Sequence, residues 1–242
     1  MPSRWTLTLK AECPEAAAPV SPAHLHATTA HLVEPSDGDH HAQTKPYSVA
    51  PLKDLGNGRA SLHIGWLIDT TRPRLDQRIG ERIRFGPQSF RITGAHEDLV
   101  PYAALRHLPP ARRALLTFCS PTYFARAGRW YPMPDPTLLY NGLARRWNTY
   151  APTGLNVPDT TLDLLLNTVS IAFVDIRSGT LRLAPDRGKR VTFTGQAEYV
   201  LTNPYQADAA PLFTTLSIYA NLAGVGAQTT HGLGAVEAEL AE

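Results

Sequence analysis

The side chains best suited to proton transfer gather in the first fifth of the sequence. Five histidines fall within eighteen residues, at His24, His26, His31, His40 and His41. Histidine takes up or releases a proton near neutral pH because its ordinary pKa lies close to that value. Lys45 follows the adjacent pair His40 and His41 by four residues and adds a cation. A histidine in a loop is usually a solvated surface residue, so the cluster is a candidate for acid–base chemistry and not yet a site.

A metal site is the competing interpretation of the same cluster. Asp37 and Asp39 could add oxygen ligands beside His40. On a helix, however, residues two positions apart face different directions, so His24 and His26 cannot bind one ion together. The sequence also lacks the HExxH motif and the paired His/Cys pattern of zinc proteins. We therefore expect no metal and no other cofactor.

The stretch GVGAQTTHGLGAVE, residues 224–237, holds Gly224, Gly226, Gly232 and Gly234 between a helix-like run and a short strand-like run. A helix C-cap and a bulge would account for one or two of them, since glycine tolerates positive φ. Four glycines indicate that another group approaches the backbone closely, and a phosphate held by main-chain N–H groups is the usual case. The order, helix before strand, excludes a P-loop and a Rossmann motif.

Basic residues form three clusters in the second half of the chain, although the net charge is only +2. Two clusters lie beside a tryptophan, Trp130 or Trp147, and aromatic rings can stack on bases. Such clusters are usually solvated surface, but together they also fit a path for a nucleic acid backbone. The clusters are Arg126 with Arg129, Arg145 with Arg146, and Arg187 with Lys189 and Arg190.

The apolar periodicity of residues 1–110 predicts one domain. Ser21 followed by Pro22 is typical of a helix start, and this helix runs from about residue 23 to 33. A second helix over residues 74–83 follows from apolar residues spaced by four. The predicted strands, with a GNG turn between the second and third, are 4–11, 46–52 and 60–69, and residues 89–95 and 98–106 indicate one or two more. The order strand, helix, strand, strand, helix, strand is that of a ferredoxin-like (RRM-like) domain.

Residues 111–242 repeat this order less regularly and predict a second domain of the same kind. The expected helices cover residues 136–147 and 212–222. The expected strands are 113–119, 168–175, 179–185, 191–201 and 235–240, the second and third of these forming a pair around Arg177-Ser-Gly. The chain is therefore expected to have an α+β fold of two tandem ferredoxin-like βαββαβ domains.

Composition is that of an ordinary soluble globular protein. Of the 242 residues, 43% are hydrophobic and 18% are charged. No run approaches the roughly 18 apolar residues of a membrane span, and the N-terminus resembles no targeting peptide, so we expect a cytoplasmic protein that does not bind membranes. Cys13 and Cys119 are too few and too far apart for a disulfide framework, which fits a reducing compartment.

Four segments in order resemble one family. The glycine stretch is similar to the C-terminal glycine-rich loop of the RAMP superfamily, more specifically of the CRISPR repeat-RNA endoribonucleases. The other three segments are similar to that family's histidine loop, serine-proline strand end and penultimate core strand. They are HHAQTKPYSVAPL (residues 40–52), FCSPTYFARAGRWYPMPDP (118–136) and TFTGQAEYVL (192–201).

The resemblance implies metal-independent cleavage of CRISPR precursor RNA. The 2′-hydroxyl attacks the phosphate, and the products carry a 2′,3′-cyclic phosphate and a 5′-hydroxyl. His40 or His41 would be the base or acid, Lys45 the charge stabiliser, and His31 a further candidate from the helix. The RNA-binding set would be the three basic clusters and the glycine-rich loop, with Gly224, Gly226, Gln228, Thr229, Thr230, His231, Gly232 and Gly234.

Two features depart from the family's pattern, and three alternatives stay open. Gln228 stands where the family usually has lysine, and the first helix offers histidines where a tyrosine or another polar residue is common. A noncatalytic RNA-binding subunit of an effector complex would share the same fold, so the histidine loop must distinguish the two. A ferredoxin-like small-molecule binding protein is a third hypothesis.

The expected partner is CRISPR repeat RNA. The resemblance leaves open whether the protein also binds effector-complex proteins or forms a homodimer.

Overall fold

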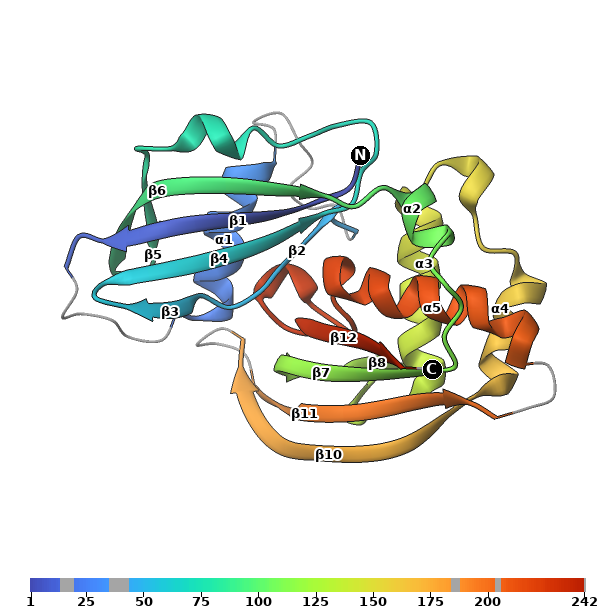
Figure 1. Cartoon of the computed structure of the whole chain (residues 1–242). Coiled ribbons are helices and arrows are strands. Elements are labelled where there is room, and N and C mark those ends of the chain that lie inside the picture. Colours follow the sequence, from blue (N-terminus) through green and yellow to red (C-terminus); the bar gives the residue numbers. More distant parts are fainter. Residues whose placement is uncertain (14–19, 35–43, 184–187, 203–205, 242) are drawn as a thin grey trace.

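The described residues form two large antiparallel sheets, each with helices or a helix on one face, and one two-stranded hairpin (Figure 1). The computed structural model describes residues 1–13, 20–34, 44–183, 188–202 and 206–241. Among these, no helix is long and apolar enough to cross a membrane. Both cysteines are free thiols.

The first sheet has the strand order β2-β4-β1-β6-β5, and β3 pairs with β4. Helix α1 (Pro22–Val33) covers one face of this sheet (Figure 1). Strands β1, β2, β4 and β6 have the spatial order of a ferredoxin-like sheet. The strands are β1 (Ser3–Ala11), β2 (Tyr47–Val49), β3 (Lys53–Gly56), β4 (Arg59–Trp66), β5 (Arg82–Phe85) and β6 (Gln88–Leu99).

Local sequence explains the start of this unit. Trp5, Leu7 and Leu9 alternate along β1 with more exposed residues and are at most 1% exposed. The Ser21 side chain accepts a hydrogen bond from the His24 backbone N–H and so caps α1 as expected. Leu25 and other residues of the buried face of α1 pack against the same core.

The second sheet has the order β10-β11-β7-β12, again that of a ferredoxin-like domain. Its helices α3, α4 and α5 pack on one side (Figure 1). A short hairpin, β8 with β9, follows β7. The bounds are β7 (Arg113–Thr122), β8 (Phe124–Arg126), β9 (Arg129–Tyr131), α3 (Pro136–Tyr150), η3 (Thr153–Leu155), α4 (Asp159–Thr168), β10 (Val169–Arg182), β11 (Lys189–Leu201), α5 (Gln206–Ala223), η4 (Thr229–His231) and β12 (Val236–Ala241).

The expected α+β fold of two ferredoxin-like units is confirmed. The strands of the two sheets separate near residue 110, where the sequence places a domain boundary. Packing crosses that point, because Leu67, Tyr102 and Leu105 belong to the core formed by α3 and α5. Tyr102 and Leu105 come from a short helix, α2 (Tyr102–Arg106).

Three expected elements were wrong. Residues 74–83 form only a short 3-10 helix, η2 (Leu75–Arg78), because Gly80 has φ +92° and the chain then enters β5. Residues 98–106 are not a strand, since β6 ends at Leu99 and α2 follows Pro101. The strand pair expected around Arg177 is one strand, β10, whose hairpin partner is β11. The sequence interpretation also missed α4 and the β8–β9 hairpin.

Candidate active site

The glycine-rich loop joins α5 to β12, and its close approaches are to the protein's own chain. Gly226 has φ +73°, and a Cβ there would overlap the Tyr123 carbonyl oxygen. Gly232 has φ +82°, and a Cβ there would overlap the Leu25 side chain of α1. Both contacts would be under 3.0 Å, a separation that real Cβ atoms do not show. Packing within the protein therefore accounts for both glycines without a phosphate.

Backbone hydrogen bonds attach this loop to the end of β7. The Ala227 N–H donates to the Tyr123 carbonyl at 2.9 Å, and the Gly234 N–H donates to the Pro121 carbonyl at 3.2 Å. Within the loop, the Val225 N–H donates to the Gly234 carbonyl at 2.8 Å. The serine-proline strand end and the glycine-rich loop, far apart in sequence, are thus one structural unit.

A cavity of about 440 Å³ opens where this loop meets α1 and α3. This cavity brings together residues from four segments of the chain. Three of them, Lys45, Arg145 and Arg146, are lysine or arginine. The lining residues are His26 of α1, Thr44 and Lys45, Arg145, Arg146, Thr149 and Tyr150 of α3, and Gln228, Thr229, Thr230 and His231 of the loop.

Two histidines stack in this cavity. The rings of His26 and His231 are 4.0 Å apart between centroids and only 8° from parallel. His26 Nδ1 lies 3.1 Å from the Thr230 carbonyl oxygen. A carbonyl only accepts hydrogen bonds, so Nδ1 carries the proton in this contact. In the neutral ring, His26 Nε2 then has a lone pair that can accept a proton.

A buried ion pair borders the same cavity. Lys45 Nζ lies 3.0 Å from Glu34 Oε1, and the two side chains are 10% and 8% exposed. The Tyr47 hydroxyl donates to the same carboxylate oxygen at 3.2 Å. Burial, and then the charge of Glu34, raise the pKa of Tyr47, so its hydroxyl stays protonated. Glu34 and Lys45 flank the segment with His40 and His41, both of which lie outside the described residues.

Arg146 and its neighbour Arg145 have different environments. Arg146 donates to the Ala223 carbonyl at 2.6 Å, to Thr229 Oγ1 at 2.5 Å and to the Tyr47 carbonyl at 3.2 Å. Burial lowers the pKa of Arg146 from its ordinary value. Arg145 is exposed at the cavity wall. Arg146 therefore connects α3, α5, the loop and β2, while Arg145 is available to solvent.

The other expected site residues lie outside this cavity. His31 has a side chain that is 71% exposed, and its Nε2 is 3.9 Å from Glu81 Oε1. Arg126 and Arg129 are on the β8–β9 hairpin. Lys189 and Arg190 begin β11. Arg187 lies outside the described residues.

Sequence reasoning missed His26 as a lining residue, together with Thr44, Thr149 and Tyr150. His26 belonged to the histidine cluster, but spacing could not tell which helical histidine faces the loop. The helix turns about 100° per residue, so His26 and His31 point in different directions. Only the position of the loop identifies His26 as the inward one.

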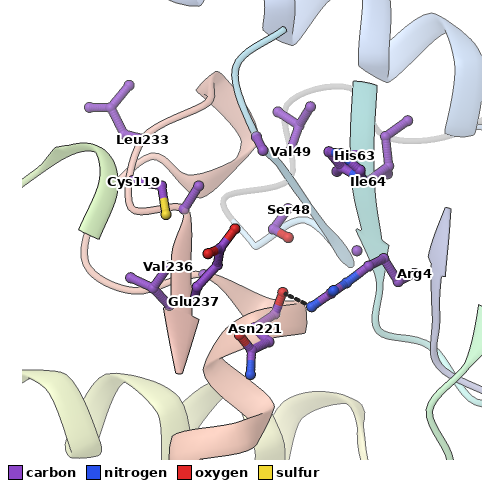
Figure 2. Close-up of a pocket in the computed structure, with 14 residues that line it drawn as sticks. Arg4, Ser48, Val49, His63, Ile64, Cys119, Asn221, Leu233, Val236 and Glu237 are labelled. Atoms are coloured by element: carbon purple, nitrogen blue, oxygen red, sulfur yellow. Dashed lines mark hydrogen bonds between the residues drawn. The ribbon is translucent and has the colours of Figure 1, made fainter. Parts of the chain in front are cut away.

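A second, smaller cavity of about 140 Å³ lies between the two sheets. Figure 2 shows His63 and Arg4 of the first sheet across from Cys119 and Glu237 of the second. Arg4 donates to the Asn221 carbonyl at 3.1 Å. Burial lowers the pKa of His63, and the charges of Arg4 and Lys53 lower it further, against the opposing effect of Glu237.

The described part of the chain contains no group of three His, Cys, Asp or Glu side chains arranged to hold a metal ion.

The fold and the loop define the class of protein. Two ferredoxin-like units with a C-terminal glycine-rich loop form this chain, and a solved structure described as an RAMP protein binding different RNA substrates has the same fold (TM-score 0.58, 12% identity, 99% of this chain and 100% of that chain). A family model, CRISPR-associated endoribonuclease Cas6, matches residues 116–236, half of the chain. The chain belongs to the Cas6 family. It is a CRISPR-associated endoribonuclease that processes precursor CRISPR RNA.

Individual relatives agree over nearly the whole length. The Cas6 endoribonuclease of Mycobacterium tuberculosis is 23% identical over 98% of this chain and 78% of the relative. A Cas6 protein solved as a product complex has a TM-score of 0.82 and 26% identity, covering 98% of this chain and 99% of that chain. Thermus thermophilus Cas6 has a TM-score of 0.76 and 23% identity over 99% of this chain and 98% of its own, which shows the fold alone.

Arg146→Lys is expected to lower the free energy of unfolding by about 2 kcal/mol, because lysine cannot reproduce the hydrogen bonds of the guanidinium fork. The matched control, Arg145→Lys, should change it by less than about 0.5 kcal/mol because that side chain is exposed. Urea unfolding monitored by circular dichroism measures both. Equal effects would contradict the connecting role of Arg146.

Gly226→Ala is expected to destabilise the fold more than Gly56→Ala. The two glycines have similar φ values, +73° and +76°, but a Cβ at Gly56 meets nothing within 4 Å. Both variants carry the left-handed backbone cost of about 1 kcal/mol. Gly226→Ala adds a clash with backbone, which we expect to cost about 2 kcal/mol more. Similar melting temperatures for the two variants would show that the loop does not need this close contact.

His63 is expected to titrate below 6.5, its ordinary pKa, in the folded protein. Arg4→Gln should raise that value because it removes a nearby cation. The folded protein then binds fewer protons than the unfolded chain, so the contribution of His63 to stability is full above about pH 6.5 and falls as pH drops below it. Histidine ring NMR signals followed across pH test this. A pKa at or above the ordinary value contradicts it.

Proposed function

We propose that this protein cuts CRISPR precursor RNA within its repeats without a metal ion. The observation that carries the proposal is the cavity where the stacked pair His26 and His231 meets Lys45 and the glycine-rich loop. The ion pair between Lys45 and Glu34 borders the segment that holds His40 and His41. Proton donors, acceptors and cations therefore converge on one place.

The reaction needs three functions. A base removes the proton of the 2′-hydroxyl, whose oxygen bonds to the adjacent phosphorus. An acid protonates the 5′ oxygen as its bond to phosphorus breaks, and a cation stabilises the charge on the phosphate oxygens. The products are a 2′,3′-cyclic phosphate and a 5′-hydroxyl, so no water is consumed in this step.

Two histidines and a lysine supply these three functions. His40 or His41 is one member of the acid–base pair, as the resemblance implies. His26 is the other, because its Nδ1 proton is held by the Thr230 carbonyl and Nε2 can exchange a proton with the RNA. Lys45 is the cation, and its ion pair with Glu34 fixes the position of its ammonium group.

Repeat RNA is the substrate and binds along the basic face near this cavity. Gln228, Thr229, Thr230 and His231 contact the RNA at the cleavage point, and Arg145 contacts the adjacent phosphate. Arg126, Arg129, Lys189 and Arg190 extend the path, and Arg146 positions the loop. The similarity to a Cas6 product complex supports a bound RNA in this fold. Residues 1–110 then carry the histidine segment, and residues 111–242 carry the glycine-rich loop.

The test is cleavage of the host's repeat RNA in EDTA by the wild type and by four variants: His26→Ala, His31→Ala, His40→Ala and His41→Ala. We expect wild-type cleavage to persist in EDTA and to stop on RNA with a 2′-deoxy sugar at the cut. His26→Ala and one of His40→Ala and His41→Ala should lose about 100-fold or more in single-turnover rate. The exposed His31 lies outside the cavity, and its variant decides whether that residue contributes.

The control is His96→Ala, since His96 is exposed and pairs with Asp98 on the same strand. Loss of cleavage in EDTA, restored by Mg²⁺, would overturn the metal-independent mechanism. Tight binding of repeat RNA by the wild type with no cutting would instead indicate a noncatalytic RNA-binding subunit. Wild-type rates for His26→Ala would remove that residue from the mechanism.

A further inference from the structure

The β8–β9 hairpin carries an exposed tryptophan at its surface. Trp130 is 53% exposed, whereas the other tryptophans, Trp5, Trp66 and Trp147, are at most 5% exposed. The hairpin turn is tight, with positive φ at Ala127 and Gly128. Tyr131 and Met133 beside it are also exposed, at 38% and 45%, and a group of neighbouring exposed apolar side chains can mark a binding surface.

An arginine from another strand holds this ring in place. The guanidinium carbon of Arg190 lies 4.5 Å from the centroid of the Trp130 ring and 5.4 Å from that of Tyr123. Arg190 also donates a hydrogen bond to the Tyr123 hydroxyl. Tyr123 is 1% exposed, so the arrangement is anchored in the interior. Cation–π contact on one side thus orients Trp130 without covering it.

Tyr123, which holds Arg190, also contacts the glycine-rich loop of the candidate active site. The Tyr123 carbonyl accepts the Ala227 N–H of the glycine-rich loop at 2.9 Å. A narrow cavity lined by Ala125 of β8, Arg145 and Ala227 runs beside this contact. Arg145 also lines the larger cavity with the stacked histidines. Trp130 is therefore held in a fixed relation to the proposed cleavage site.

The chemistry around Trp130 favours RNA as the occupant. Arg126 and Arg129 lie on the same hairpin, and residues 121–134 contain no acidic residue. An aromatic ring beside cations is the combination that binds a base by stacking and its phosphates by charge. A protein partner that covered this patch would instead have to supply acidic groups.

We propose that Trp130 is a stacking platform for one base of the repeat RNA, and that Arg190 is the positioning residue that orients its ring. This inference rests on the proposed function. The base lies outside the cleavage cavity, so Trp130 sets the register of the RNA and takes no part in proton transfer.

The first experiment measures affinity for repeat RNA that carries a 2′-deoxy sugar at the cleavage site. We expect Trp130→Ala to weaken binding about 5-fold to 100-fold and Trp130→Phe to lose much less, since phenylalanine still stacks. The slope of log affinity against log salt should not change for Trp130→Ala, because stacking releases no counterions. Arg129→Gln should reduce that slope by about one unit.

Met133→Ala is the matched control, because Met133 is 45% exposed near the same hairpin but has no ring. It should bind as the wild type does. Equal losses for Met133→Ala and Trp130→Ala would indicate a general apolar contact, and unchanged affinity for Trp130→Ala would overturn the proposal. A smaller salt slope for Trp130→Ala would overturn the stacking role and indicate that the ring only positions Arg190 for a phosphate.

The second experiment locates the base. Abasic sites placed one at a time along the RNA should weaken wild-type binding at one position without weakening Trp130→Ala further, as expected for two halves of one contact. RNA should also quench tryptophan fluorescence of the wild type and not of Trp130→Phe, since the other tryptophans are buried. No such position, or equal quenching, contradicts the proposal. These binding readouts need no cleavage, so they remain informative if the catalytic proposal fails.

Discussion

The site depends on one partly buried cation whose hydrogen bonds all go to the protein itself. Arg146 has its guanidinium in contact with the end of α5, with Thr229 of the loop and with the backbone of β2. Strand β2 belongs to the first sheet, whereas α5 and the loop belong to the second unit. A guanidinium can do this because its planar fork offers several donors in fixed directions. The loop and the first sheet are therefore held in one orientation before any RNA binds.

Because Arg146 makes these hydrogen bonds, neighbouring basic residues have different roles. Arg145 and Arg146 are adjacent and chemically identical, yet Arg145 is exposed to solvent and Arg146 is partly buried and hydrogen-bonded within the protein. The same division occurs at Lys45, whose charge is balanced by Glu34 while its position borders the cavity. The charges of Lys45 and Arg146, which have partners within the protein, stabilise the fold. The exposed charge of Arg145 is available to bind RNA phosphates.

The glycine-rich loop shows the limit of a local interpretation. A run of glycines indicates that another group lies close to the backbone, but it does not show whether that group is a ligand or part of the protein. Gly226 and Gly232 are crowded by Tyr123 and Leu25, which are distant in sequence. The expected strand pair around Arg177 failed for a related reason, because a central glycine resembles a turn until its partner strand is known. The helix expected over residues 74–83 had the right apolar spacing, but Gly80 and pairing with β6 favoured a strand.

The sequence alone determined the α+β class, the order of two ferredoxin-like units, the capped first helix and the family resemblance. These follow from periodicity, from turn and cap residues and from motif order, which are local properties. Only the tertiary structure decided that His26 faces the loop while His31 does not, that Arg146 donates to three distant segments, and that Arg190 holds Trp130. Each of these depends on which distant segments meet, and a side chain's chemistry is set by what surrounds it and not by its neighbours in the chain.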